Sequence, residues 1–270
     1  MAKVRGAPPL SRITLLRDRV DDWHTFPFNV RAVATLDELD VRERVLFFVG
    51  ENGSGKSTLL EAIALSCGFG PEGGTRNLSF TTRVSAAPSI DDADAPTKRL
   101  SEALRLSWTR QRQRDGFFLR AESFHNFASE LDRLERERRM GRSYLAPYGG
   151  TSLHDRSHGE SFLTLFLERF SGRGLFLLDE PEAALSAARQ LALIVRMNDL
   201  LADDEGAQFV VATHSPILLA FPHAQIVSFD GPRMHEIPYR QTDAYAITRR
   251  FLSDPDVAIR RLLTDSDETR

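Results

Sequence analysis

Residues 50–57 constrain the fold of this chain more than any other segment. They read GENGSGKS and fit the pattern G-x-x-x-x-G-K-[ST] at every fixed position. The apolar run RVLFFV, residues 44–49, comes directly before them, and residues 57–66 follow with the apolar spacing of a helix. A strand, a glycine-rich turn and a helix in this order predict a phosphate-binding loop, because glycines let several backbone N–H groups converge on one anion.

The side chains of this loop predict which phosphates and which metal ion it binds. Lys56 is expected to reach the β- and γ-phosphates of ATP, and the hydroxyl of Ser57 is expected to bind Mg²⁺. Lys56 stands out because only three of the 35 basic residues are lysines. The predicted nucleotide-binding residues are the loop and the residue after it: Gly50, Glu51, Asn52, Gly53, Ser54, Gly55, Lys56, Ser57 and Thr58.

A second acidic group for the metal is expected at the end of another buried strand. Residues 175–178, LFLL, are followed by Asp179 and Glu180. Asp179 is expected to hold Mg²⁺, directly or through a water, and Glu180 to polarise the water that attacks ATP. The alternative is a strand that ends in an acidic helix cap, with Pro181 at the first helical position. The nearby phosphate loop favours the metal-binding interpretation.

The order of these motifs resembles that of the ABC-type ATPases, over about residues 45–216. Residues 157–161, SHGES, resemble the signature motif of this family, LSGGQ or LSGGE. The resemblance implies that Ser157, Gly159 and Glu160 of one subunit cap the γ-phosphate held by the phosphate loop of another. Arg156 and His158 depart from the family's Leu and Gly. Ser157 and Glu160 also fit a capping box at a helix start, and the two interpretations are compatible.

His214 follows the predicted strand 208–213 and resembles the family's switch histidine, which contacts the γ-phosphate and the attacking water. A structural histidine is the alternative. The resemblance implies an ATP hydrolase in which Glu180, His214 and Lys56 are the catalytic residues. Residues 179–190, DEPEAALSAARQ, are similar to the SMC and RecF branch of the family.

Two parts of the family's nucleotide site have no clear match in this sequence. The Q-loop residue, which senses Mg²⁺, is assigned by position to Glu122, with Gln111 and Gln113 as alternatives. By its position before the phosphate loop, the aromatic residue expected to stack on adenine is Trp23 or Phe26. Both aromatic residues fit equally well as core residues.

Strands alternate with helices along the chain, and a mostly helical stretch lies in the middle. We expect an α/β fold, a P-loop NTPase core of the ABC-ATPase type over residues 1–270. An inserted short helical lobe, about residues 122–160, is expected to end in the signature motif, and the tail, residues 243–263, to be helical. Other expected elements are a strand over 26–34, a hairpin of 104–108 with 117–120, a hairpin of 225–229 with 234–237, and a helix over 181–201.

Composition excludes several classes of protein. The chain is 41% hydrophobic and 27% charged, which is typical of a globular protein that buries a core. A net charge of −3 gives no general attraction to nucleic acid or an anionic membrane. Cys67 is the only cysteine, which excludes an internal disulfide and a cysteine zinc site. The sequence contains no run of about 20 apolar residues, so no membrane-spanning helix is expected. The cytoplasm is therefore the expected location.

The expected function is that of a soluble ABC-type ATPase that forms a homodimer around two ATP·Mg²⁺ and couples closure to a protein or nucleic-acid partner. DNA maintenance and defence are the expected settings, since the chain is similar to small stand-alone bacterial ATPases of the AAA and ABC type. One alternative is the ATP-binding subunit of a membrane transporter, docked on a separate permease. A second is an ATP-dependent interaction module with little turnover.

Overall fold

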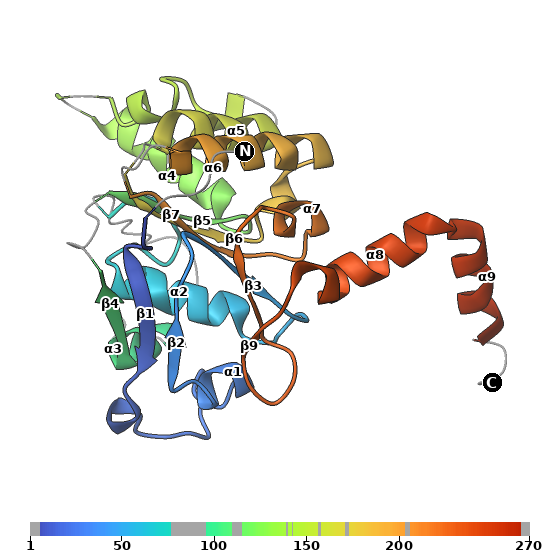
Figure 1. Cartoon of the computed structure of the whole chain (residues 1–270). Coiled ribbons are helices and arrows are strands. Elements are labelled where there is room, and N and C mark those ends of the chain that lie inside the picture. The colour runs from blue at the N-terminus through green and yellow to red at the C-terminus, as the bar shows by residue number, and fades with distance from the viewer. Residues whose placement is uncertain are drawn as a thin grey trace.

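The computed structural model describes residues 6–76, 96–109, 115–138, 140–141, 143–155, 158–170, 173–202 and 206–265. Within these ranges the chain forms the predicted α/β fold, with one six-stranded sheet and one three-stranded sheet (Figure 1). The larger sheet has helices on both faces, and the smaller sheet lies against one of those faces.

The larger sheet carries the site and is parallel except at one edge. Its strands lie in the order β5 (Gly116–Arg120), β6 (Leu175–Asp179), β7 (Gln208–Ala212), β3 (Val45–Val49), β8 (Gln225–Ser228) and β9 (His235–Glu236). Only β9 is antiparallel to its neighbour. Strands β3, β6 and β7 are buried along their whole length and read as continuous apolar runs, as expected for parallel strands covered on both faces.

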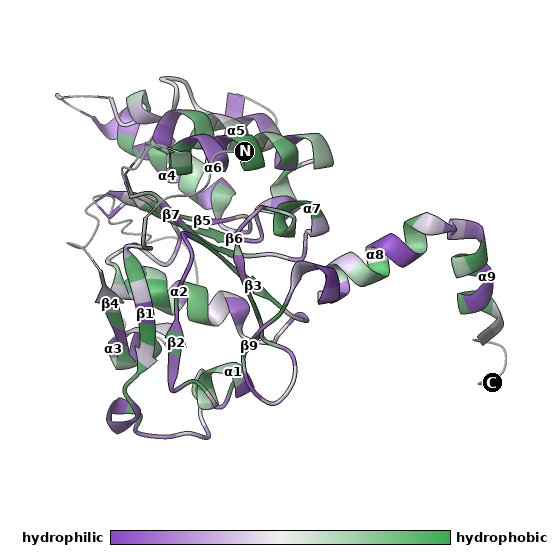
Figure 2. Cartoon of the chain, viewed as in Figure 1, coloured by the Kyte–Doolittle hydropathy of each residue, from purple (hydrophilic) through white to green (hydrophobic). Residues whose placement is uncertain are grey.

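Each face of this sheet contributes to its own hydrophobic core. Along β3, Val45 and Phe47 belong to one core, and Leu46 and Phe48 belong to the other. Figure 2 shows β3 as a hydrophobic strand in the middle of the molecule. The first core is covered by α4 (Phe124–Glu137), α5 (His158–Arg169), α6 (Ala187–Ala202) and α7 (Pro216–Leu219). The second core is covered by α1 (Arg31–Ala34), α2 (Lys56–Ser66), α3 (Pro96–Ala103) and the smaller sheet.

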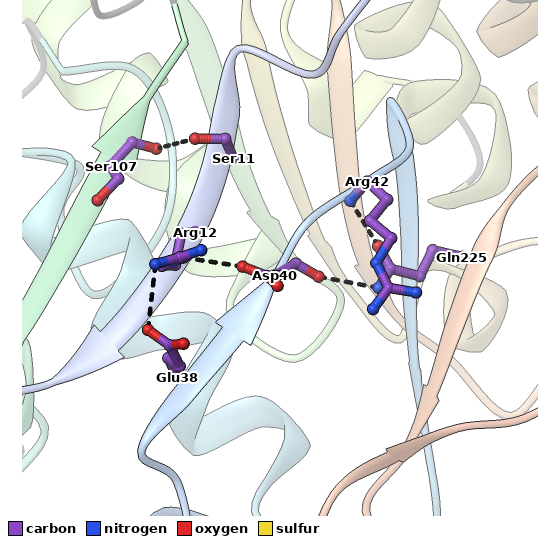
Figure 3. A network of polar contacts seen from close by, with 7 residues as sticks. All are labelled: Ser11, Arg12, Glu38, Asp40, Arg42, Ser107 and Gln225. Carbon is purple, nitrogen blue, oxygen red and sulfur yellow. Dashed lines mark hydrogen bonds and ion pairs between the residues drawn. The ribbon is translucent and has the colours of Figure 1, made fainter.

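The smaller sheet is antiparallel, with the order β2 (Glu38–Asp40), β1 (Leu10–Leu15) and β4 (Leu104–Trp108). Arg12 of β1 pairs with Glu38 at 3.2 Å and with Asp40 at 2.8 Å (Figure 3). Gln225 of β8 donates to the carbonyl of Asp40 and accepts from the amide of Arg42, both at 2.9 Å. The two hydrogen bonds of Gln225 fix the smaller sheet to β8 of the larger one.

A buried glutamine makes a second link between the sheets. The side chain of Gln208, on β7, accepts from the amide of Leu10 at 2.7 Å and donates to its carbonyl at 2.9 Å. Gln208 is fully buried, so both of its polar atoms need such partners. The link anchors the start of β1 beside the central strands.

The C-terminal tail is helical, as predicted, and projects away from the body (Figure 1). It consists of α8 (Asp243–Ser253) and α9 (Pro255–Asp265), and the chain leaves the helical conformation at Asp254 between them. Hydrophilic and hydrophobic residues alternate along both helices in Figure 2. The large apolar side chains that they expose are Ile247, Phe251, Leu252, Ile259, Leu262 and Leu263.

Several predicted elements were wrong in detail. Residues 26–34 form turns and the short helix α1 instead of a strand. Segments 104–108 and 117–120 are strands but not a hairpin, because β4 pairs with β1 and β5 pairs in parallel with β6. The predicted hairpin of 225–229 with 234–237 is confirmed by the antiparallel pair of β8 and β9.

The long helix expected over residues 181–201 is interrupted near its start. A 3-10 helix, η4 (Pro181–Ala184), ends at Leu185, whose backbone is extended with φ −118° and ψ 123°. Leu185 is buried in the core, and its carbonyl accepts from the side chain of Gln190 at 3.0 Å. Burial of this leucine and capping of its carbonyl favour the break, after which α6 begins. The segment expected to form a lobe, about residues 122–160, contains α4, η2 (Ala146–Tyr148), η3 (Leu153–Asp155) and the start of α5.

Candidate functional site

The predicted site residues gather at the carboxyl ends of the parallel strands. The phosphate loop follows β3, Asp179 ends β6 and His214 follows β7, and they are joined there by Arg120, which was not predicted and which ends β5. In open parallel sheets this edge is where ligands bind. The sheet order therefore brings together residues that are far apart in the sequence.

The phosphate loop needs glycine for two reasons, a positive backbone φ and the close approach of a neighbouring side chain. Gly50, Gly53 and Gly55 have φ of 143°, 79° and 103°, a conformation that other residues rarely adopt. A Cβ at Gly55 would also lie only 2.6 Å from the Cγ1 atom of Val30. Gly55 is thus required both by its backbone angle and by the close approach of the neighbouring segment.

Lys56 begins α2 and folds back over the loop. Its ammonium group donates to the carbonyls of Gly50 at 2.7 Å and Glu51 at 2.8 Å. Burial lowers the pKa of Lys56, and the nearby carboxylates, that of Glu180 first, act in the opposite direction. The positive charge is therefore held at the loop, where a phosphate would need it.

The two predicted metal ligands are in direct contact. The Ser57 hydroxyl donates to the Oδ1 atom of Asp179 at 2.8 Å. Burial raises the pKa of Asp179 to about 6, although the hydrogen bond from Ser57 opposes this. A hydroxyl and a carboxylate oxygen fit Mg²⁺, which binds few protein groups and keeps waters and phosphates as its other ligands. The described residues contain no cluster of three or more acidic, His or Cys side chains able to hold a metal without such help.

Sequence reasoning missed Arg120, the last residue of β5. Arg120 lies opposite Asp179 in the register of β5 with β6. Its Nη1 atom is 3.0 Å from the Oε2 atom of Glu61, and its Nε atom is 3.7 Å from the Oδ2 atom of Asp179. An arginine that closes an apolar strand, FFLR, was the available signal.

Glu180 and His214 face each other beside the loop. The Nε2 atom of His214 is 3.7 Å from the Oε1 atom of Glu180, and both side chains are about 40% exposed. Glu180 has a left-handed backbone, with φ 48°, and its amide donates to the carbonyl of Ala212 at 2.9 Å. The carboxylate of Glu182, another residue that sequence reasoning missed, accepts from the amide of His214 at 2.5 Å. These two hydrogen bonds hold the backbone of Glu180 and His214 and so position their side chains.

Other predicted site residues lie elsewhere or outside the described residues. Ser157, Gln111 and Gln113 fall on positions that the structure does not describe. Gly159 lies in the first turn of α5, and the Glu160 carboxylate is 3.9 Å from Arg189 of α6. Glu122, the predicted Q-loop residue, is exposed in the turn after β5, two residues beyond Arg120.

Neither predicted adenine-stacking residue lines the two described cavities that border the loop. One cavity of ≈ 580 Å³ is lined by residues 29–31, 51–54 and 229–231 together with Asp243, and it includes neither aromatic residue. Trp23 is instead covered by the guanidinium group of Arg17, 4.3 Å from the ring centroid. Phe26 is 47% exposed. A second cavity of ≈ 530 Å³ lies between Gly50, His214 and the start of α8.

Two family models match separate segments of the chain, and the second begins within the signature segment. Residues 28–142, which contain the phosphate loop, match an AAA domain. Residues 160–220, which contain Asp179, Glu180 and His214, match an AAA domain whose description also names the AbiEii toxin of a type IV TA system. No curated protein matches the sequence.

Several solved structures resemble the chain loosely. An ATP-binding cassette of an ABC transporter is 17% identical, with a TM-score of 0.42, and the match covers 93% of this chain and 97% of the other. A bacterial ABC transporter cassette, solved as a dimer, is 17% identical with a TM-score of 0.39, covering 77% and 91%. The SMC head domain from Thermotoga maritima is 13% identical with a TM-score of 0.39, covering 85% and 98%. At these scores the likeness adds nothing to what the chain's own residues show.

Within the described part of the chain, every helix falls short of the length and hydropathy that a membrane span needs. The family models match the segments that carry the phosphate loop and the acidic strand end. In the fold, β3 and β6 lie on either side of β7 in one parallel sheet, and Ser57 lies 2.8 Å from Asp179. Two segments of the chain thus match AAA-domain models, and in the fold they meet at one phosphate loop.

Proposed function

We propose that this chain binds ATP with Mg²⁺ and hydrolyses it. The observation that carries the proposal is the 2.8 Å hydrogen bond between Ser57 and Asp179, beside a phosphate loop that holds Lys56. A hydroxyl and a buried carboxylate at this position fit the metal of a nucleoside triphosphate. The side chains of Glu180 and His214, each about 40% exposed, lie beside this site.

The chain's own residues account for each role in the reaction. The amides of the loop and Lys56 would bind the phosphates, while Ser57 and Asp179 would hold Mg²⁺. The bound ion would withdraw charge from the phosphate oxygens. Glu180 would accept a proton from the attacking water. The water oxygen would form a bond to the γ-phosphorus while the bond from this phosphorus to the leaving ADP oxygen breaks. His214, held by Glu182, would orient the γ-phosphate.

Turnover measurements with matched variants test the assignment of Glu180. Glu180→Gln keeps the shape of the side chain but removes the base, so we expect ATP hydrolysis to fall at least about 100-fold with ATP affinity retained. Glu168→Gln, an exposed change on α5, is the matched control and should hydrolyse ATP like the wild type. Unchanged turnover in Glu180→Gln would remove the proposed role of this residue.

We further propose that the working site is shared between two copies of the chain. Glu180 and His214 are about 40% exposed in one copy, which leaves room for a second surface against the γ-phosphate. The proposed second surface is the signature segment with Ser157, Gly159 and Glu160. In sedimentation, Glu180→Gln should become a dimer with ATP and Mg²⁺ and remain a monomer without nucleotide. A monomer at saturating ATP would contradict the shared site.

A partner is proposed from the family match and is tested by co-purification. The second matched model names a toxin of a type IV TA system, which favours defence over transport as the setting. We propose a cytoplasmic location and coupling of dimer closure to a protein or nucleic acid. Material that co-purifies with ATP-loaded Glu180→Gln would identify this partner. Recovery of a membrane permease would support the transporter alternative instead.

A further inference from the structure

Arg120 occupies an unusual place between two carboxylates. Its guanidinium group lies 3.0 Å from the Glu61 carboxylate on α2 and 3.7 Å from the Asp179 carboxylate on β6. The three side chains are only 23%, 16% and 8% exposed, respectively. A positive charge is thus enclosed at the place where the proposed function needs a divalent cation.

The two oxygens of Asp179 have different partners. The Oδ1 atom accepts from Ser57, and the Oδ2 atom faces the Nε atom of Arg120. This Nε atom is shielded from solvent and has no hydrogen-bond partner. The guanidinium group is therefore bound firmly to Glu61 and only by charge to Asp179, so it can leave Asp179 without breaking a hydrogen bond at Nε.

A cation held by Ser57 and Asp179 would lie close to Arg120. The ion and the guanidinium group would share one carboxylate, and their like charges would repel each other. Phosphates add several negative charges on the opposite side of the ion and offset this repulsion. The same arginine would therefore disfavour the free ion much more than the ion that arrives with a nucleotide.

We propose that Arg120 is a positioning residue that neutralises Asp179 in the nucleotide-free protein, so that the divalent cation binds only together with the nucleotide. Glu61 holds the guanidinium group back when the cation enters. The inference rests on the proposed Ser57 and Asp179 site. A purely structural role, tying β5 to α2, would leave cation affinity unchanged and is the alternative that the test separates.

The test is a titration of nucleotide-free protein with Mn²⁺, followed through the electron paramagnetic resonance signal of the free ion. Arg120→Gln should bind Mn²⁺ at least about tenfold more tightly than the wild type, the factor expected from a single and a double charge about 6 Å apart in water. Arg120→Lys keeps the charge and should behave like the wild type. Adding Asp179→Asn to Arg120→Gln should abolish the gain, which places the ion at Asp179.

Equal or weaker Mn²⁺ binding by a folded Arg120→Gln protein would overturn the proposal. If this variant does not fold, Glu61→Gln supplies the test, because the guanidinium group then pairs with Asp179 alone. Mn²⁺ affinity in the presence of ATP should fall several-fold in Glu61→Gln, and an unchanged affinity would overturn the proposal. The nucleotide-free titration does not depend on ATP binding, so a failure of the proposed ATPase function would be seen separately.

Discussion

Replacing Asp179 with Asn should stabilise the metal-free protein near neutral pH. Asp179 is buried, and burial raises its pKa from the ordinary 3.8 to about 6. At 1.36 kcal/mol for each pKa unit, the buried charge costs about 3 kcal/mol of unfolding free energy above pH 6. This pKa already includes the attraction of Arg120 and the hydrogen bond from Ser57. Asn removes the charge and can still accept from Ser57, but its amide nitrogen then takes the place of Oδ2 and faces the donor Nε of Arg120. The expected gain is therefore about 2 kcal/mol.

The dependence on pH follows from the direction of this pKa change. The folded state binds a proton at Asp179 more tightly than the unfolded state, so the wild type loses stability as pH rises from about 4 to about 6. The difference between Asp179→Asn and the wild type should be complete above about pH 7 and shrink as pH falls through this window.

Urea unfolding of both proteins without divalent cations, at pH 5 and pH 7.5, measures this difference. Asp37→Asn, at an exposed ion pair with Arg17, is the control and should change stability by less than about 0.5 kcal/mol. If Asp179→Asn is less stable than the wild type at pH 7.5, attraction to Arg120 outweighs burial and the reasoning fails.

Three further substitutions test the site and the core. Gly55→Ala should abolish ATP binding measured by calorimetry, because the Cβ of the alanine would lie 2.6 Å from Val30. Circular dichroism should still show a folded protein, and normal ATP binding would contradict the close approach. Glu182→Ala should lower turnover about tenfold with ATP affinity retained, because it removes the hydrogen-bond acceptor of the His214 amide. Unchanged turnover would show that this hydrogen bond does not position His214. Arg44→Met should cost about 3 kcal/mol in urea unfolding, because the buried guanidinium group donates to two backbone carbonyls; a loss below about 1 kcal/mol would contradict this.

The sequence predicted the parts of the fold that local pattern determines. Residues 45–66 form a strand, loop and helix as expected, and Asp179 ends a buried strand. Each of these features is encoded by neighbouring residues: an apolar run, a glycine motif, or a carboxylate directly after the run. The placement of Ser57 against Asp179 then depends on the parallel pairing of β3 and β6 with β7, which brings their carboxyl ends to the same edge of the sheet.

The errors concern features that depend on distant partners. Strand β4 alternates apolar and polar residues and β5 is mostly apolar, and nothing within either one shows that β4 pairs with β1 and β5 with β6. The break at Leu185 carries no glycine or proline, and it depends on core burial and on Gln190. Arg120 could not be predicted as a site residue because its role depends on ion pairs with Glu61 and Asp179, which lie on other elements.

Binding of ATP to the phosphate loop is the central claim, and calorimetry with Lys56→Ala tests it most directly. The Lys56 ammonium group is held over the loop by the carbonyls of Gly50 and Glu51, so its removal should abolish measurable binding of ATP with Mg²⁺. Lys98→Ala, on α3, is the matched control and should bind ATP like the wild type. Equal ATP affinity in Lys56→Ala and the wild type would contradict the assignment of this loop.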